Sequence, residues 1–224
     1  MHQQTFDQHY DSELRSHENK LFFKQWIRHP GRLGTVAPIS VKLARNAAAQ
    51  VSNSAGYVVE IGAGTGRLTR ALLESGVSSA HLAVVELDSA LCAFLKDTLP
   101  AICLASGAPQ IIEGDAAFLP DLIPSSWVGK VEAVVSAIPL MYLPEDKRIA
   151  IIEAAFKILK PAGKIIHVTY NPKSPLAFSR AYRQKRVVGL WVNIPPGFVW
   201  SYTKKENDQG AIGGSCDEVR EHNK

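Results

Sequence analysis

Between Tyr57 and Tyr170, short runs of apolar residues alternate with longer segments in which apolar residues recur every three or four positions. The first pattern is typical of strands buried on both faces, and the second of amphipathic helices. We therefore expect strands at Tyr57–Ile61, Leu82–Glu86, Gln110–Ile112, Ala133–Ser136 and Lys164–Thr169. The helices expected between them lie at Gly66–Glu74, Ser89–Thr98, Leu119–Ile123 and Glu145–Leu159. Strands that alternate with helices predict an α/β fold with a parallel sheet covered on both faces.

The residues after Tyr170 predict a different arrangement. Ser174-Pro175 has the composition of an N-cap and first helical residue, which predicts a helix from Leu176 to about Lys185. Val187–Asn193 and Phe198–Tyr202 flank a Pro-Pro-Gly turn, and together they predict an antiparallel hairpin. The polar residues 206–224 predict a flexible tail.

The N-terminal residues 1–50 precede the predicted sheet and predict a helical extension, separate from a main domain at 51–205. Its most informative segment has aromatic and aliphatic residues on one helical face and basic residues on another, which is the composition of a helix lying in lipid headgroups but is more common in helices packed on a sheet. The residues concerned are Phe22, Phe23, Lys24, Trp26, Ile27 and Arg28. A helix packed on the sheet, with its basic side chains in water, remains an alternative. Further on, Ser40 is expected to cap a helix at Val41–Gln50.

Composition fits one globular domain, since 46% of the 224 residues are hydrophobic and 21% are charged. No apolar run approaches the length of a membrane span, and no secretory signal is visible. The three cysteines, Cys92, Cys103 and Cys216, lack C-x-x-C spacing. We therefore expect reduced thiols in a cytoplasmic protein without a metal site.

Charge is distributed unevenly along the chain. Neither Asp nor Glu occurs between Lys20 and Val59 or between Ala154 and Lys205, while basic residues are frequent in both stretches. Such asymmetry indicates an anionic partner, either nucleic acid or a lipid surface.

The most specific local motif begins at the end of the first predicted strand. Glu60 is followed by Gly62, Gly64 and Gly66, and a helix is expected directly afterwards. A glycine turn between strand and helix brings backbone N–H groups close to a ligand. The dinucleotide fingerprint needs its third glycine at the position of Arg67, and an acid at Glu60 suits a ligand with an ammonium group. The segment resembles motif I of the class I S-adenosylmethionine (SAM)-dependent methyltransferases.

Two further acids strengthen this resemblance. Glu86 ends the second strand, where nucleotide-binding sheets place a carboxylate on the ribose, and Asp88 is expected to cap the next helix. Asp115 follows the third strand, where these methyltransferases hold an acid near the adenine. The resemblance implies a Rossmann-like, seven-stranded, mostly parallel sheet with a terminal antiparallel hairpin. The cofactor-binding residues it predicts are Glu60, Gly62, Ala63, Gly64, Gly66, Glu86, Leu87, Asp115, Ala116 and Ser136.

The end of the fourth strand bears on the methyl acceptor. Enzymes that methylate nucleobase amines typically place Asn or Asp there, followed by x-Pro-aromatic, to hold the amine and stack the base. Here the corresponding residues are Ala137 and Leu140, which provide neither a hydrogen-bond acceptor nor a ring. Nucleobase methylation therefore loses its main chemical support.

Three segments together resemble the soluble bacterial phospholipid N-methyltransferases, relatives of the rRNA adenine dimethyltransferases. Residues 134–140 resemble that family's V-V-S-G-L-P-L element, and residues 193–202 its N-x-P-P-A-x-V-W-x-Y hairpin. Residues 22–30, continuing through 36–38, resemble its membrane-binding segment. The chain departs from the family at Ala137, at Gly197, where alanine is usual, and at His167, where glutamine is common.

The resemblance implies sequential methylation of the phosphatidylethanolamine amine toward phosphatidylcholine, by a monomer on the inner face of the cytoplasmic membrane. An rRNA adenine methyltransferase, an ornithine-lipid methyltransferase and a non-catalytic binding protein are the alternatives. The residues expected at the reacting groups are Ser136, Tyr142, Tyr170 and Trp200. Arg180 and Arg183 are expected on lipid phosphates, and His167 is expected to be a hydrogen-bonded core residue rather than a base.

Overall fold

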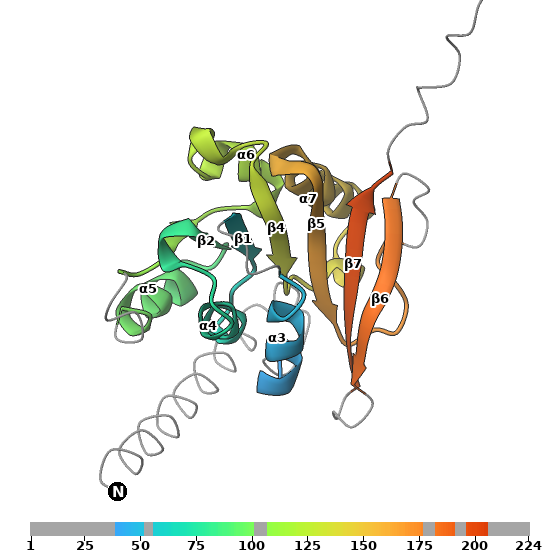
Figure 1. Ribbon diagram of the computed structural model, residues 1–224, viewed down its shortest axis with the longest axis horizontal. Helices are drawn as coiled ribbons and strands as arrows, with labels where there is room; N and C mark the ends of the chain where they lie inside the picture. Colours follow the sequence, from blue (N-terminus) through green and yellow to red (C-terminus); the bar gives the residue numbers. More distant parts are fainter. Residues whose placement is uncertain (1–38, 52–55, 101–106, 177–181, 191–195, 206–224) are drawn as a thin grey trace, which may run out of the picture.

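The computed structural model describes residues 39–51, 56–100, 107–176, 182–190 and 196–205 of the chain (Figure 1). The predicted membrane-binding segment at 22–28, Arg180 and the predicted tail lie outside the described residues. Within the described part, no helix combines the length and apolar character needed to cross a bilayer.

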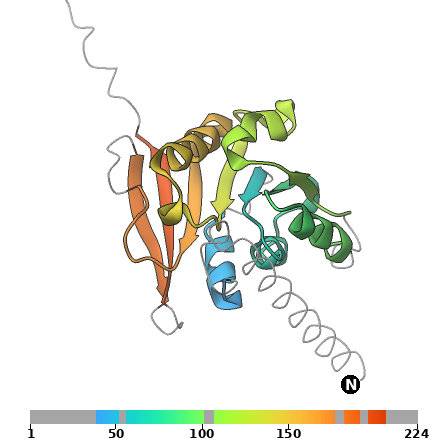
Figure 2. The ribbon, with the colours of Figure 1, turned by 180° about the vertical axis from the view of Figure 1, so that it is seen from behind.

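A seven-stranded sheet in the order β3-β2-β1-β4-β5-β7-β6 forms the centre of the molecule. The first five strands along the chain pair in parallel, and β7 joins β5 antiparallel, with β6 beside it at the edge (Figures 1 and 2). The strands are β1 (Tyr57–Ile61), β2 (Leu82–Glu86), β3 (Gln110–Glu113), β4 (Val131–Ser136), β5 (Leu159–Thr169), β6 (Tyr182–Leu190) and β7 (Gly197–Lys204). The sheet predicted from the sequence is confirmed.

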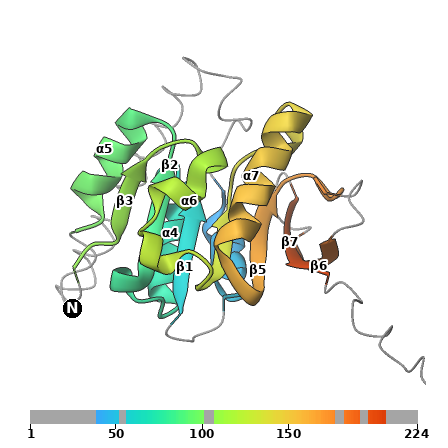
Figure 3. The same cartoon turned by 90° about the horizontal axis from the view of Figure 1, so that it is seen from above.

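Helices cover both faces of this sheet, because the crossover between parallel strands leaves each helix on one face or the other. Leu43, Leu72 and Leu95 pack with Val84 and Ile166 on one face. The opposite face has a second core that includes Ile152 (Figure 3). The helices are α3 (Val41–Ala48), α4 (Arg67–Glu74) and α5 (Ser89–Thr98) on the first face, and α6 (Leu119–Leu122) and α7 (Glu145–Ile158) on the second.

The predicted helix starts are also found. The Ser40 hydroxyl accepts a hydrogen bond from the Leu43 N–H at 3.1 Å, and the Asp88 carboxylate accepts two from the first turn of α5. Gly66 precedes α4 with a left-handed φ of 81°, which is a conformation that favours glycine. The side-chain caps at Ser40 and Asp88 supply partners for N–H groups that a helix leaves unpaired.

The predicted helix from Leu176 to about Lys185 is wrong at residues 182–185, because Tyr182–Leu190 is the edge strand β6, and residues 177–181 lie outside the described residues. The Ser174 hydroxyl still accepts a hydrogen bond from the Leu176 N–H, but it also lies 3.0 Å from the Tyr202 hydroxyl, which anchors the segment on β7. The predicted hairpin is present, with longer strands than expected. Strand β5 begins at Leu159, earlier than the expected Lys164, and Ala162 within it has a φ of 61°.

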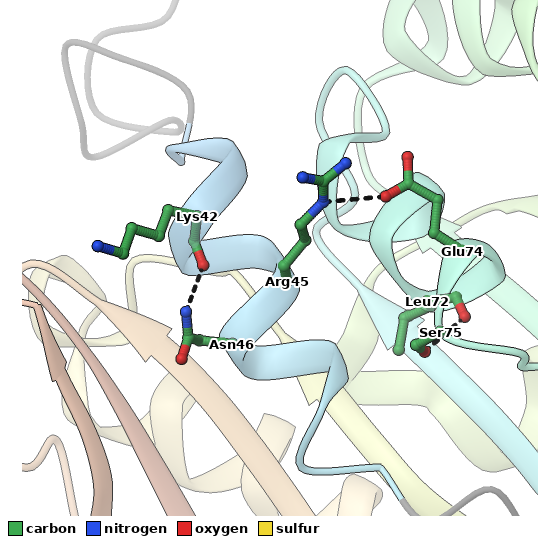
Figure 4. Close-up of polar contacts among 6 residues, drawn as sticks. All are labelled: Lys42, Arg45, Asn46, Leu72, Glu74 and Ser75. Atoms are coloured by element: carbon green, nitrogen blue, oxygen red, sulfur yellow. Dashed lines mark hydrogen bonds and ion pairs between the residues drawn. The ribbon is translucent and has the colours of Figure 1, made fainter.

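Helix α3 contacts its neighbours through both polar and apolar side chains. The Arg45 Nε donates to the Glu74 carboxylate of α4 at 3.1 Å, as Figure 4 shows. On the sheet side, Leu43 lies against Gly197 so closely that a Cβ on this glycine would be 2.5 Å from Leu43 Cδ2. This contact explains why residue 197 is glycine here, whereas alanine is usual in the phospholipid N-methyltransferases that the sequence resembles.

We predict that Gly197→Ala lowers the free energy of unfolding by about 1–3 kcal/mol, since overpacking displaces α3 from the sheet. Leu43→Val should relieve the clash, so the double variant should be more stable than the sum of the two single changes predicts. Urea denaturation of the three variants measures this coupling. Additive losses would contradict the proposed contact.

Candidate functional site

The ends of the parallel strands meet at one edge of the sheet, and a cavity of about 540 Å³ opens there. Residues from the turns after β1, β2, β3 and β4 and from the start of α7 line it. They are Gly62, Gly64, Val85, Glu86, Leu87, Gly114, Asp115, Ala116, Ala137, Ile138, Pro139, Leu143, Pro144, Lys147 and Ile151. The structure thus brings most of the predicted cofactor-binding residues together, whereas Glu60, Ala63, Gly66 and Ser136 do not line the cavity.

The glycine turn has the backbone that its sequence predicts. Gly62, Gly64 and Gly66 have φ values of 72°, 59° and 81°. A Cβ on Gly62 would lie 2.6 Å from Ile138 Cγ1, so this position allows no larger residue without a shift of the β4 turn. A Cβ on Gly64 would meet no atom within 4 Å, and this glycine therefore exposes its backbone to the open cavity.

Glu86 joins the turns after β1 and β2. Its Oε2 accepts a hydrogen bond from the Gly64 N–H at 2.8 Å. Its Oε1 accepts from the Leu87 and Asp88 N–H groups at 2.8 and 3.0 Å. Burial raises the pKa of Glu86, and these three donors oppose that shift. The carboxylate lies in the cavity wall, where it could also accept a ribose hydroxyl.

Glu60 is fully buried behind the glycine turn, and neither of its carboxyl oxygens has a hydrogen-bond partner among the described residues. Burial raises its pKa to about 8, with the nearby charge of Glu86 adding to the shift and Thr69 opposing it. The ionised form of a buried acid without a hydrogen-bond partner is stabilised when a cationic group binds nearby. The structure therefore supports the expectation of a ligand with an ammonium group.

Asp115 lies at the other end of the cavity. Its Oδ1 accepts a hydrogen bond from the Ala117 N–H at 3.1 Å, and its Oδ2 lies 3.0 Å from the Lys147 ammonium of α7. Partial burial acts to raise its pKa, but these two partners lower it overall. Lys147 was not predicted from the sequence, because nothing in the sequence indicates that the first turn of α7 faces the turn after β3.

A second, smaller cavity of about 160 Å³ shares Pro139 with the first. It is lined by Ile39, Pro139, Met141, Tyr142, Val168, Thr169, Tyr170, Asn171 and Pro172. We call it the acceptor pocket. Tyr142 and Tyr170, which the sequence singles out, come together here from the ends of β4 and β5. Burial raises the pKa of Tyr170, opposed by the Ser40 backbone and the charge of Arg67.

Ser136, His167 and Trp200 line neither cavity. The Ser136 hydroxyl accepts from the Ile138 N–H and lies 3.3 Å from His167 Nδ1 beneath the β4 turn. Burial lowers the pKa of His167 to about 3, so the imidazole is neutral at physiological pH, as expected of a core residue. Trp200 pairs with His167 across the sheet and packs against the core. Arg183, predicted to contact lipid phosphate, lies on β6 beside Thr203 at the opposite end of the sheet.

Comparison with known sequences gives a consistent result. Residues 58–163 match the family model described as a methyltransferase domain. An ornithine lipid N-methyltransferase from Singulisphaera acidiphila is 25% identical over 166 residues, which cover 73% of this chain and 82% of that protein. A probable ribosomal RNA small subunit methyltransferase A from Haloquadratum walsbyi is 45% identical over only 60 residues, 27% of this chain and 19% of that protein.

Solved structures share the fold. Magnesium protoporphyrin IX methyltransferase from Synechocystis PCC 6803, solved with bound SAM, has a TM-score of 0.58 at 10% identity and covers 84% of this chain and 97% of its own. TrmN from Thermus thermophilus has a TM-score of 0.58 at 15% identity over 75% of this chain, which spans about half, 49%, of the TrmN chain.

We predict two effects of Glu60→Gln. The raised pKa of Glu60 means that folding favours its protonated form, so its destabilising effect appears as pH rises from the usual value near 4.5 toward about 8. The variant should therefore gain several degrees in Tm over the wild type at pH 8 and little at pH 4. Its affinity for SAM should fall at least about tenfold, because a neutral amide does not pair with an ammonium group.

Thermal unfolding at both pH values and calorimetric titration with SAM measure these effects. Glu113→Gln, an exposed acid at the end of β3, is the matched control and should change neither. A Tm gain of equal size at both pH values, or unchanged SAM affinity, would remove the assigned role of Glu60.

The residues present fit SAM. Gly62 and Gly64 would hold its methionine part, Glu86 its ribose and Asp115 its adenine, and Glu60 lies buried behind the glycine turn that would meet the ammonium group. Pro139 lines both this cavity and the acceptor pocket. The Rossmann-like methyltransferase fold, the methyltransferase domain matched at residues 58–163 and the chemistry of the cofactor site together indicate SAM-dependent methyl transfer.

Proposed function

We propose that this enzyme methylates the primary amine of a membrane aminolipid, with phosphatidylethanolamine as its substrate. The observation that supports this most directly is the acceptor pocket. Its wall includes the rings of Tyr142 and Tyr170 and the apolar side chains of Ile39, Met141 and Val168, and it contains no acidic residue. A pocket of this composition suits a small amine that becomes a bulkier cation as methyl groups are added.

The composition of the pocket also bears on how the amine becomes reactive. SAM supplies a methyl group on a sulfonium, and the attacking nitrogen must have a free lone pair. A primary alkylamine has a pKa near ~10 in water, and apolar walls lower it by disfavouring the charged form. Pro139 lines both cavities, and we assign the meeting of methyl donor and acceptor to this point. Positioning at this point is the main contribution we assign to the protein.

The neutral, buried His167 supplies no base to this pocket. Tyr170, whose pKa burial raises, is a hydroxyl rather than a phenolate at neutral pH and can orient the amine by a hydrogen bond. We therefore assign Tyr170 to orientation and Tyr142 to contact with the cationic product.

Ornithine lipid is the second candidate substrate. It also presents a primary amine near an anionic group, and the relative from Singulisphaera acidiphila bears this activity in its name. The resemblance of residues 134–140 and 193–202 to phospholipid N-methyltransferases favours phosphatidylethanolamine. Both lipids fit the same chemistry in the acceptor pocket.

RNA methylation is less well supported. Ala137 lines the cofactor cavity but has no group that could hold a base amine, and Leu140 is fully buried in the core rather than available for stacking. Tyr142, at 70% exposure, is the one ring near this strand end that could contact a base. RNA therefore belongs in the test as a competing acceptor.

The test is transfer of label from SAM by the purified protein, with phosphatidylethanolamine vesicles, ornithine-lipid vesicles and structured RNA offered in parallel. We expect mono-, di- and trimethylated phosphatidylethanolamine. Label confined to ornithine lipid would keep the reaction class and change the substrate. Label in RNA alone would overturn the proposal.

A second prediction concerns Tyr142. Tyr142→Ala should lower kcat/KM for the lipid about 3- to 30-fold, the range expected for loss of one cation–π contact, with SAM affinity unchanged. Tyr142→Phe keeps the ring and should retain most of the activity. Steady-state kinetics with each methylation intermediate would show the largest loss on the later, more cationic steps. Equal losses in both variants would contradict an aromatic role.

A further inference from the structure

Large apolar side chains that face solvent gather near the edge of the sheet where the carboxyl ends of the parallel strands meet, which we call the reactive edge. In the described part of the chain these are Val41, Leu87, Phe118 and Tyr142, while the fifth exposed large apolar residue, Ile149, lies within α7. Leu87, Phe118 and Tyr142 follow the ends of β2, β3 and β4. Val41 begins α3 beside the end of β5, since Ile39 lines the acceptor pocket and the Ser40 backbone contacts Tyr170. Exposed apolar side chains gathered at one place indicate a partner.

Charge divides this edge into two parts. Around Leu87 and Phe118 lie acids, among them Asp88, Glu113 and Asp115. On the β5 side, residues 39–51 and 159–176 contain neither Asp nor Glu. The exposed Lys42 and Lys173 lie there and form no ion pair within the described ranges. In Figure 4 the Lys42 side chain extends away from α4 and from the Arg45–Glu74 pair.

We propose that Val41, Lys42, Tyr142 and Lys173, which we call the mouth rim, dock the enzyme on a lipid bilayer. This rests on the proposed function, because an aminolipid keeps its acyl chains in the bilayer while its amine enters the acceptor pocket. The pocket mouth must then lie at headgroup level. Apolar side chains of the rim enter the interface, and its two lysines contact lipid phosphates.

The connectivity of the chain agrees with this placement. The segment predicted to lie in lipid headgroups, residues 22–28, is joined to the structure through Ile39, which is part of the acceptor pocket wall. This point of attachment directly precedes Val41 and Lys42 of the mouth rim along the chain. Arg183 of β6 lies elsewhere, since it aligns with Thr203 of β7 and through it with Lys164 in the middle of β5, away from the carboxyl end of that strand.

The test is a triple variant, Val41→Ser/Lys42→Glu/Lys173→Glu. It leaves both pockets intact, and an acid at position 42 suits the first turn of a helix. The matched control is Ile149→Ser/Lys130→Glu/Lys204→Glu. Val41 and Ile149 are both 37% exposed, Lys130 and Lys204 lie at the opposite end of the sheet, and the charge change is the same.

Two readouts are needed: flotation with vesicles of phosphatidylethanolamine and an anionic phospholipid, and methylation rates on these vesicles and on a short-chain, monomeric phosphatidylethanolamine. We expect the mouth-rim variant to lose at least about tenfold in vesicle binding and in the vesicle rate, with the rate on the monomeric lipid and SAM affinity unchanged. The control should match the wild type throughout.

Unchanged vesicle binding in the mouth-rim variant, or equal losses in variant and control, would overturn the docking surface. Failure of the wild type to methylate either lipid would instead overturn the proposed function. Flotation would still decide whether the mouth rim binds lipid.

Discussion

A parallel sheet must be covered on both faces, and this constraint determines where the chemistry of the molecule lies. Each of the strands β1 to β4 is followed by a crossover on one face or the other, so the carboxyl ends of β1 to β5 all reach the same edge. Glu60, Glu86, Asp115, Tyr142 and Tyr170 are far apart in sequence, and they gather only because of this shared direction. Two cavities that meet at Pro139 are the result.

At that edge, two buried acids differ in the hydrogen bonds that their carboxylates receive. Glu86 receives three backbone N–H groups, which hold the turns after β1 and β2 together. Glu60 receives none within the described structure and so weakens the fold at neutral pH. Retaining such a residue in the centre of a sheet is consistent with selection for binding rather than for stability.

The sequence allowed much of this to be predicted, for reasons that differ between elements. The five parallel strands and the caps at Ser40 and Asp88 were found because buried strands and side-chain caps have strong local patterns. The first part of the edge strand β6 was mistaken for a helix because Arg183, Gln184, Lys185 and Arg186 are all exposed and hide the alternation typical of a strand. Only pairing with β7 decides their conformation. Lys147 and Ile39 line the cavities only because of tertiary packing, and no local sequence pattern predicts such packing.

The same run of charged residues has a consequence for the behaviour of the protein at high concentration. In the described sheet, β6 pairs with β7 on one side, and its other side leaves backbone N–H and C=O groups available to another chain. Strands of this kind seed aggregation when they are long, flat and apolar. Arginine and lysine side chains along β6, and the irregular register between Arg186 and Val188, oppose edge-to-edge pairing through repulsion and twist. The hairpin of β6 and β7 therefore completes the sheet and also prevents further strands from pairing with its edge.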